Sequence, residues 1–327
     1  MNAMPTAPSA SQADPVQQRR QEFSKGYAAI FGTVLIWSTP SLFMFYLNRF
    51  YDPYAQNFYR YSIACLAVLP FAFYPFERKA ARLDLSLLLA CFLVALPNVV
   101  HQITQVMALF YMGPGVYAIF MRSTVIMTAV GALVFFPEER WVIRQWQFQL
   151  GTVLGMLGAV GVLWFQPGWE AGHVPLYGVA IAFVSALCWA LYGVLVKRPS
   201  AALGSVRSFG VISFLTSMLL LPLTLVFGKI ATPFQVSSHV NLILVVSAVT
   251  CISVAHVLYY VAIRELGVAL SQTLQLLCPL FALALSAWLF GERLTLLQLW
   301  SAGILLLGAF LAMRVKPIRI AEAAESL

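Results

Sequence analysis

The sequence predicts an all-α integral membrane protein with ten transmembrane helices, arranged as two inverted five-helix repeats around a central cavity. Three observations predict this fold: an apolar composition, ten apolar segments of transmembrane length and an internal repeat. Hydrophobic residues make up 61% of the 327 residues and charged residues only 10%, whereas a soluble domain is roughly half apolar and about a quarter charged. One aqueous core cannot bury so much apolar surface, so lipid must solvate most of it.

The apolar segments give the positions of the ten helices. Each is close to the ~20 residues that ~30 Å of hydrocarbon requires, and helices are required because lipid cannot satisfy open backbone groups. Short connections make neighbouring spans antiparallel. The expected spans are, in order, 26–48, 54–75, 85–108, 116–136, 147–165, 177–196, 207–228, 240–263, 268–290 and 296–314. Residues 1–24 and 317–327 are predicted as cytoplasmic tails, and the first of these, which is polar, is predicted to be disordered.

The lysines and arginines predict the orientation of these spans. With the N-terminus inside the cell, the cytoplasmic ends carry fifteen of these residues and the outer ends carry three. Cytoplasmic loops attract basic residues, so both termini should be cytoplasmic and the number of spans even. We therefore expect a multi-pass protein of the cell (inner) membrane. The net charge of +8 is explained by this topology, and no nucleic-acid partner is inferred from it.

An internal repeat relates the two halves, which we assign to 25–168 and 174–316. The offset between matching residues is nearly constant over several spans. The matches at offset 152 are Gly26 with Gly178, Trp37 with Trp189, Pro70 with Pro222 and Gly151 with Gly303; those at offset 154 are Ala108 with Ala262, Gly113 with Gly267, Glu138 with Glu292 and Trp146 with Trp300. Because five is odd, the second repeat should enter the membrane from the opposite side. Transporters use this arrangement to open alternately to each side.

Several short motifs carry a family resemblance. They are Trp37-Ser38-Thr39, Asp52-Pro53, Phe58-Tyr59-Arg60-Tyr61, Ala108-Leu109 with Gly113, Phe290-Gly291-Glu292-Arg293-Leu294-Thr295 and Gly303-Ile304-Leu305-Leu306-Leu307-Gly308. In order, spacing and duplication they resemble the EamA-type members of the drug/metabolite transporter superfamily, over nearly the whole chain after residue 25. The resemblance implies a ten-helix basket with helices 5 and 10 at its periphery. It also implies export or exchange of amino acids, related metabolites or drugs.

Two arginines and one histidine lie inside the expected spans. Arg60 and Arg122 each lie six residues into a span, roughly 9 Å below its outer end, and His101 lies roughly 10 Å deep. A charge at that depth should face the protein interior rather than lipid. We hypothesise that the two guanidinium groups bind an anionic group of the substrate, such as a carboxylate, because arginine binds carboxylates bidentately. For Arg60 a role in helix packing or loop anchoring is an equal alternative.

The third span carries a polar stripe. Asn98, His101, Gln102 and Gln105 follow the spacing i, i+3, i+4, i+7 and therefore share one helix face. In lipid such a face must line a cavity or contact other helices. We favour a cavity, because four polar groups exceed what packing needs, and keep interhelical hydrogen bonding as the alternative.

The ninth span carries a smaller polar set beside a proline. Gln272 and Gln275 lie near Pro279, which frees a backbone carbonyl one turn earlier. Such breaks often line binding sites in transporters, and a simple kink is the alternative.

Two aromatic residues are also candidates for the substrate site. Trp37 lies at mid-span, where its indole N–H needs a partner, and Tyr117 lies near the level of the arginines. Either could instead be a packing or interfacial residue. His256 in the eighth span is interpreted as a packing residue; a proton carrier is the alternative.

Other function classes lack their signatures. All twelve acidic residues lie in tails or at span ends, so no mid-membrane carboxylate is available for a proton relay. No motif indicates a hydrolase, a metal site or a nucleotide site, so neither enzyme activity nor a cofactor is predicted. The prediction is a secondary transporter, an exporter or exchanger of small, carboxylate-bearing metabolites, in a lipid bilayer. A membrane enzyme and a receptor or scaffold without transport activity are the alternatives. Glycines in the fifth and tenth spans allow close packing within the chain or in a homodimer.

Overall fold

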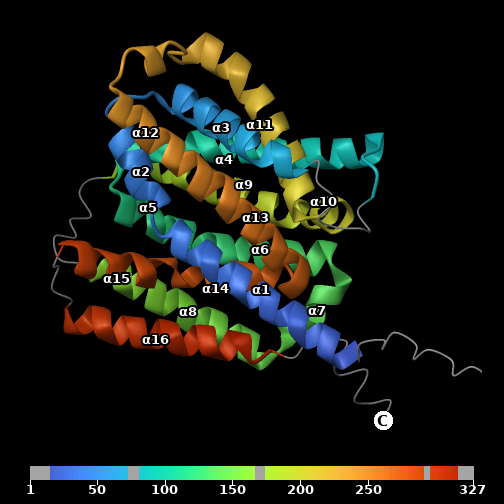
Figure 1. The fold of residues 1–327 in the computed structure, drawn as a ribbon. Helices are drawn as coiled ribbons and strands as arrows, with labels where there is room; N and C mark the ends of the chain where they lie inside the picture. The colour runs from blue at the N-terminus through green and yellow to red at the C-terminus, as the bar shows by residue number, and fades with distance from the viewer. Residues whose placement is uncertain (1–14, 73–80, 166–173, 291–294, 316–327) are drawn as a thin grey trace, which may run out of the picture.

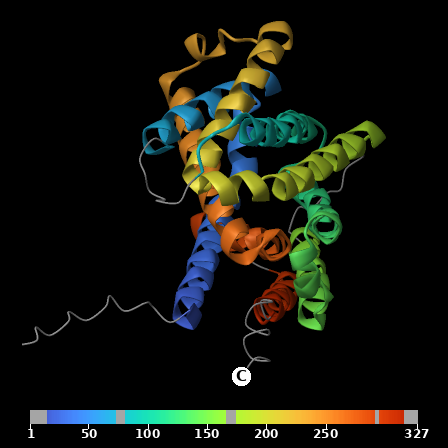
Figure 2. The ribbon, with the colours of Figure 1, turned by 90° about the vertical axis from the view of Figure 1, so that its right-hand side faces the viewer.

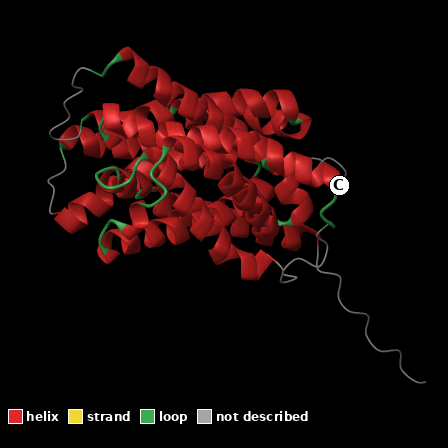
Figure 3. Cartoon of the chain, turned by 90° about the horizontal axis from the view of Figure 1, so that it is seen from above, coloured by secondary structure: helices red, strands yellow, loops and turns green. Residues whose placement is uncertain are grey.

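A computed structural model describes residues 15–72, 81–165, 174–290 and 295–315. Every regular element in these ranges is helical, and none of the described residues forms a strand, as Figure 3 shows. The prediction of an all-helical fold is therefore confirmed for this part of the chain. The predicted tails and the motif residues Gly291, Glu292, Arg293 and Leu294 lie outside the described residues, except for the end of the first tail.

The first repeat folds into short and long helices in alternation. Its elements are α1 (Pro15–Trp37), α2 (Pro40–Leu47), α3 (Pro53–Ala72), α4 (Leu85–Tyr111), α5 (Pro114–Met121), α6 (Ser123–Phe135), the 3₁₀ turn η1 (Pro137–Glu139), α7 (Arg140–Arg144) and α8 (Trp146–Trp164). Proline stands at the first position of α2, α3 and α5, where its missing N–H and fixed φ favour a helix start.

The second repeat contains one further irregularity. Its elements are α9 (Leu176–Leu195), α10 (Lys197–Leu203), α11 (Ser205–Phe227), the 3₁₀ turn η2 (Thr232–Phe234), α12 (Ser238–Ser247), the π-helical η3 (Ala248–Val254), α13 (Ala255–Leu266), α14 (Val268–Leu274), the 3₁₀ turn η4 (Gln275–Leu277), α15 (Cys278–Phe290) and α16 (Leu296–Met313). The π-helical segment continues α12 into α13 without a gap, so the three elements together cross one expected span.

Eight helical segments of the described residues are long and apolar enough to cross a bilayer. The segments expected at 54–75 and 268–290 are helical over their described residues but are not among the eight. Polar side chains such as Asn57 and Arg60 dilute the first, and the apolar helix described in the second is short, Val268–Ala282. The ten-helix count therefore stays a prediction.

The helices pack in pairs that relate the two repeats. The most extensive contacts join α8 to α16, α4 to α9, α3 to α11 and α1 to α13. In Figure 1, α8 and α16 lie side by side along the lower edge, away from α3 and α11 at the top. α8 and α16 are repeat counterparts, as are α3 and α11, so each of these pairs joins a helix to its own counterpart. α4 is the counterpart of α13 and α9 is the counterpart of α1, so the pair α4–α9 corresponds to the pair α13–α1. A two-fold relation between the repeats predicts this pattern; their opposite insertion in the membrane stays a prediction.

Glycines allow α8 and α16 to touch backbone to backbone. A Cβ atom at Gly151 would lie 2.7 Å from the Gly308 carbonyl oxygen, and one at Gly158 would lie 2.7 Å from the Leu305 Cα. Figure 2 views this pair nearly end-on, with α16 in red. These glycines therefore pack within the chain, and a homodimer stays an untested prediction.

A carboxylate links three spans at the end of the bundle where α6 finishes. The side chain of Glu139 accepts hydrogen bonds from the Val268 and Ala269 backbone N–H groups, both at 2.9 Å, and so caps α14. Lys197 at the start of α10 pairs with Glu139 at 2.5 Å and with Glu138 at 2.9 Å. Burial acts to raise the pKa of Glu138, but hydrogen bonds from its backbone and from Lys197 hold that pKa below its ordinary value.

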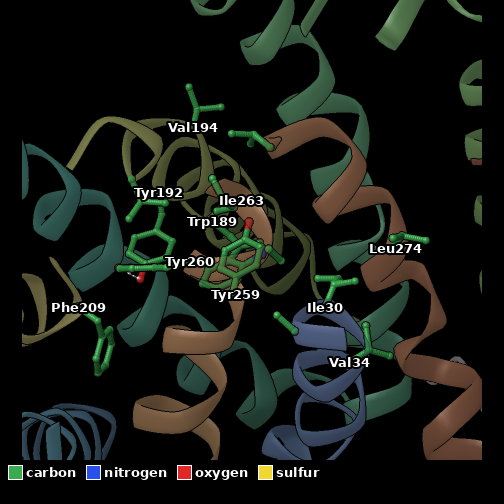
Figure 4. Close-up of a cluster of buried hydrophobic side chains, with 14 of the residues drawn as sticks. Ile30, Val34, Trp189, Tyr192, Val194, Phe209, Tyr259, Tyr260, Ile263 and Leu274 are labelled. Atoms are coloured by element: carbon green, nitrogen blue, oxygen red, sulfur yellow. Dashed lines mark hydrogen bonds between the residues drawn. The ribbon is translucent and has the colours of Figure 1, made fainter. Parts of the chain in front are cut away.

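A cluster of aromatic side chains fills the space between α9, α11 and α13. Figure 4 shows Trp189 stacked on Tyr259, with ring centroids 5.8 Å apart. The hydroxyls of Tyr192 and Tyr260 are hydrogen-bonded, and Phe209 closes the cluster from α11. All five side chains are buried, and one of them, Trp189, also lines the cavity described next.

Candidate ligand-binding pocket

Four of the expected spans are interrupted. The first breaks between α1 and α2, the fourth at Arg122 between α5 and α6, the eighth in η3, and the ninth in η4. At the first break, the Ser38 hydroxyl donates to the Leu35 carbonyl at 2.6 Å and the Thr39 hydroxyl donates to Ile36 at 2.8 Å. These hydroxyls satisfy carbonyls that the broken helix releases, as a membrane interior requires.

A cavity of about 360 Å³ lies where these four breaks meet. Each broken span contributes lining residues, among them Ser38, Arg122, Cys251 and Pro279. Sites for small molecules typically occupy ~300–1,000 Å³, so this cavity has the size for a small metabolite. Discontinuous helices around a central cavity are typical of substrate sites in transporters.

Eight of the ten predicted site residues line this cavity. They are Trp37, Arg60, His101, Gln102, Gln105, Tyr117, Arg122 and Gln275. They come from α1, α3, α4, α5, η4 and the break at Arg122, so the fold brings together residues far apart in the chain. The structure gives the position of these eight residues at the cavity wall. That each of them binds substrate stays a prediction.

The other two predicted residues do not line the cavity. The Asn98 side chain accepts from the Tyr61 hydroxyl and donates to Thr216 Oγ1, both at 3.1 Å. The Gln272 side chain accepts from Tyr259 at 2.8 Å and donates to Thr124 at 3.0 Å. Both amides therefore join helices to one another, which is the alternative left open for these polar faces.

Arg60 is a buried cation with unused donors. Its side chain is 2% exposed, and its Nε and Nη1 atoms have no hydrogen-bond partner among the described residues. A structural anchor would be expected to have its donors satisfied, because a buried unpaired charge is costly. Arg60 lines the cavity, but its two unpartnered nitrogens are themselves almost completely buried.

Arg122 has partners of a different kind. Its Nε donates to the Ala118 carbonyl at 3.0 Å and its Nη1 donates to the Gln275 carbonyl at 3.2 Å. Pro279 has no N–H to donate to the Gln275 carbonyl four residues earlier. The Arg122 side chain, from the fourth span, donates to that carbonyl instead. The Cys278 N–H bonds the same carbonyl in 3₁₀ fashion.

Aromatic rings form the deep wall of the cavity. Trp37 and Trp189, which are repeat mates, meet edge to face with centroids 5.1 Å apart. The Trp37 Nε1–H donates to the Cys251 carbonyl in η3 at 2.9 Å. His256 lies 5.1 Å from Trp37 and stacks on Phe209 at 5.4 Å, centroid to centroid.

A hydrogen-bond chain positions His101 and Tyr117. His101 Nδ1 lies 2.9 Å from the Ser185 carbonyl oxygen, and Tyr117 shares a 2.8 Å hydrogen bond with the Ser185 hydroxyl. Because the carbonyl can only accept, Nδ1 carries the hydrogen. Ser185 of α9 thus fixes the orientation of two lining side chains from α4 and α5.

Sequence reasoning misses two prominent lining residues. It interprets His256 as a packing residue and identifies Trp189 only as a repeat mate, yet both line the cavity. The repeat itself holds the missing signal. His256 is at offset 154 from Gln102, the offset that aligns Ala108 with Ala262.

The charged side chains among the described lining residues of the cavity are all cationic. Arg60 and Arg122 are part of its lining, and no described lining residue is an aspartate or glutamate. No cluster of metal-ligating side chains occurs among the described residues. The described wall therefore offers hydrogen-bond donors and positive charge, together with apolar and aromatic surface.

Comparisons with known proteins agree with this architecture. The sequence matches the EamA-like transporter family over residues 24–164 and again over 176–314, once in each half. A protein of Clostridium kluyveri described as an uncharacterized transporter is 24% identical over 279 residues, which cover 83% of this chain and 87% of that protein. A protein known from a crystal structure superposes with a TM-score of 0.72 at 16% identity, covering 94% of this chain and 99% of the other. At that identity the likeness concerns the fold alone.

Proposed function

This chain belongs to the EamA-like transporter family, and from that premise we propose that it is a secondary transporter of small, carboxylate-bearing metabolites, working by alternating access as an exporter or exchanger. The family and the eight apolar helices make it a multi-pass membrane protein. The substrate class and the direction are the parts that we add.

The observation that carries the proposal is the charge of the cavity. Arg60 and Arg122 both line it, and no described carboxylate lines it to neutralise them. Two cations in a low-dielectric site favour an anionic ligand. A carboxylate also matches the planar geometry of a guanidinium.

The form of the cavity supports transport rather than catalysis. Its wall contains breaks in the first, fourth, eighth and ninth spans, and irregular backbone at membrane depth is used where it lines a cavity. The charged and polar lining contains two histidines and two cysteines, but no recognised nucleophile–base arrangement or metal cluster among the described residues.

The energy source that we propose is the gradient of the substrate or of an exchanged metabolite. No acidic residue lies at mid-membrane, which argues against a carboxylate-based proton relay, and no nucleotide-binding motif occurs in the sequence. Exchange should therefore depend little on pH.

Metabolite-resolved counterflow in reconstituted vesicles at two pH values tests the proposal. We expect exchange of carboxylate-bearing compounds that changes little with pH, and a large loss of exchange in Arg60→Gln and Arg122→Gln. Arg49→Gln, at an exposed arginine outside the cavity, is the matched control and should behave as the wild type. The proposal is wrong if no carboxylate exchanges, or if both cavity variants exchange every carboxylate at the wild-type rate.

A further inference from the structure

The segment that leads into α4 is tied to the second repeat by three hydrogen bonds. The Ala81 N–H donates to the Ala202 carbonyl of α10 at 2.9 Å. Arg207 Nη1 of α11 donates to the Ala81 carbonyl at 3.2 Å, and Arg198 Nη2 of α10 donates to Ser86 Oγ at 3.4 Å. The first repeat therefore meets α10 and α11 here, at the end of the bundle where α10 and α7 lie in Figure 1.

Three arginines surround this segment. Arg82 lies within it, and Arg198 and Arg207 bond the residues on either side of Arg82. We call these three residues the arginine cluster. Arg82 and Arg198 are exposed and Arg207 is half-buried. No salt bridge between described residues involves any of the three. A guanidinium has five N–H donors, so most of the donors of the cluster are left for a ligand.

The carboxylates closest to the cluster along the chain have partners of their own. Asp84 accepts from the Leu87 N–H at 2.8 Å and so caps α4. At the start of α10, Lys197 pairs with Glu138 and Glu139. Three guanidinium groups against the one carboxylate of Asp84 leave a net positive charge around the segment. Like charges gathered at one place favour an anion between them.

A stripe of exposed leucines begins beside the arginine cluster. Leu85, Leu89, Leu93 and Leu96 recur every three or four residues, so they share one face of α4. They are 42–71% exposed. From the first to the last of them the helix rises roughly 16 Å, about half of the ~30 Å thickness of the hydrocarbon core. We call these residues the leucine stripe; its length matches the depth of one leaflet.

We propose that the arginine cluster binds the phosphate of one anionic phospholipid, whose acyl chain packs along the leucine stripe. Arginine suits a phosphate because its planar guanidinium donates two parallel hydrogen bonds. Basic pockets between helices at a membrane surface bind anionic head groups in this way. The cluster combines one arginine of the first repeat with two of the second, so the bound lipid stabilises the contact between the repeats. This site is separate from the cavity and goes beyond the proposed transport function.

Membrane topology alone is the competing explanation for these charges. Basic residues are enriched at cytoplasmic helix ends whether or not they bind a lipid. Arg144 at the end of α7 and Arg314 after α16 are exposed arginines of this kind. Topology depends on the number of such charges, whereas a binding site depends on their place. Removing charges from the cluster and from these other ends therefore distinguishes the two explanations.

Thermal unfolding of the full chain, delipidated in a neutral detergent, tests the class of ligand. The additions are phosphatidylglycerol, phosphatidylcholine with the same acyl chains, and glycerol phosphate, which carries the charge without the chains. We expect phosphatidylglycerol to raise the melting temperature by about 2–5 °C more than phosphatidylcholine does, and glycerol phosphate to leave it unchanged. Native mass spectrometry of the same samples gives the apparent Kd of each lipid.

A pair of double variants tests the place of binding. Arg198→Gln/Arg207→Gln removes two charges from the cluster, and Arg144→Gln/Arg314→Gln removes two charges elsewhere. The cluster variant should bind phosphatidylglycerol about 5- to 30-fold more weakly and lose most of the rise in melting temperature. The control variant should bind it as the wild type does.

Each contrary outcome overturns a stated part of the inference. If phosphatidylcholine stabilises the protein as much as phosphatidylglycerol, the site does not select an anion and the inference is wrong. If glycerol phosphate stabilises it equally well, the cluster binds a free phosphate and the lipid assignment is wrong. If the two double variants lose affinity equally, net charge is the cause and the site is wrong.

Single variants keep the test decisive if the cluster double variant does not fold. Arg198→Gln and Arg207→Gln should each weaken binding of phosphatidylglycerol about 2- to 5-fold, and Arg144→Gln should not. Equal affinity in all three single variants would overturn the assignment to the cluster.

Discussion

Single side chains in this protein satisfy backbone groups that a break in another span has released. Trp37 donates to the Cys251 carbonyl in the π-helical segment, and Arg122 donates to the Gln275 carbonyl near Pro279. Within a bilayer no water replaces a missing donor, so such contacts hold an irregular backbone in place. These two side chains therefore couple the first span to the eighth and the fourth to the ninth.

The Trp37 contact can be tested by a change that keeps the ring. Trp37→Phe preserves aromatic packing but removes the donor to the Cys251 carbonyl. We expect a loss of about 1–3 kcal/mol in the free energy of unfolding, because a buried acceptor loses its partner. Thermal unfolding in detergent measures the loss. Trp300→Phe, at a tryptophan that is 68% exposed, is the control; equal melting temperatures for the two variants would contradict the prediction.

Much of the cavity wall could be predicted from residue chemistry alone. A charged or polar side chain at mid-span cannot face lipid, and this reasoning leads to Arg60, His101 and Arg122, which all line the cavity. Helical periodicity finds the polar face of a helix but not the neighbour that covers it, which is why Asn98 and Gln272 contact other helices instead. Substrate binding by the lining residues stays a prediction.

At the scale of elements, the sequence marks two of the four helix breaks and leaves the other two unmarked. Pro40 and Pro279 mark two of the four interruptions in the sequence, because proline has no N–H for the helical ladder. The interruption at Arg122 and the π-helical segment Ala248–Val254 have no such local marker. They depend on tertiary partners, which a single sequence does not reveal.

The most extensive contact between the described helices, that of α8 with α16, leads to a prediction about stability. Gly158→Leu should lower the free energy of unfolding by about 1–3 kcal/mol or more, since the new side chain meets the Leu305 backbone. Gly303→Leu changes a glycine on α16 in the same way, but a Cβ there meets nothing within 4 Å. Melting of both variants in detergent provides the comparison. A Gly158→Leu protein as stable as Gly303→Leu would show that this packing is absent.

The cap of α14 gives a second prediction at this scale. Glu139→Gln keeps one acceptor oxygen but loses the charge, one backbone hydrogen bond and the pairing with Lys197. We expect a loss of about 1–3 kcal/mol in the free energy of unfolding. Glu138→Gln, at a side chain that is 59% exposed, should cost about 0–1 kcal/mol. Equal unfolding free energies would refute a capping role for Glu139.

The pairing of helices in the whole molecule has the pattern that a two-fold repeat predicts. The pairs α8–α16 and α3–α11 each join counterparts, and α4–α9 is the counterpart of α13–α1. The described chain also begins and ends at the same end of the bundle in Figure 1, as an even number of crossings requires. Hydropathy and the offsets of 152 and 154 predict this order. They could not give the tilt of the helices or the volume between them, which depend on side-chain packing.

Membrane orientation is the prediction that belongs to this scale. Cysteines introduced at Ser11 and Ser326 should both react with an impermeant maleimide only after the cytoplasmic face is opened, because the basic residues place both ends inside. A cysteine introduced at Arg49 serves as the outer-face control and should react in intact cells. Labelling of one terminus but not the other in intact cells would exclude an even number of spans.

The two halves share a backbone plan but not a set of charges. Arg60 has Ile212 at its repeat position, and Arg122 has Leu276. The helix plan is thus common to both halves, whereas both cationic residues of the cavity lining come from the first half. A few substitutions in the first half could therefore change the charge of the cavity while the helix plan of both halves stays the same.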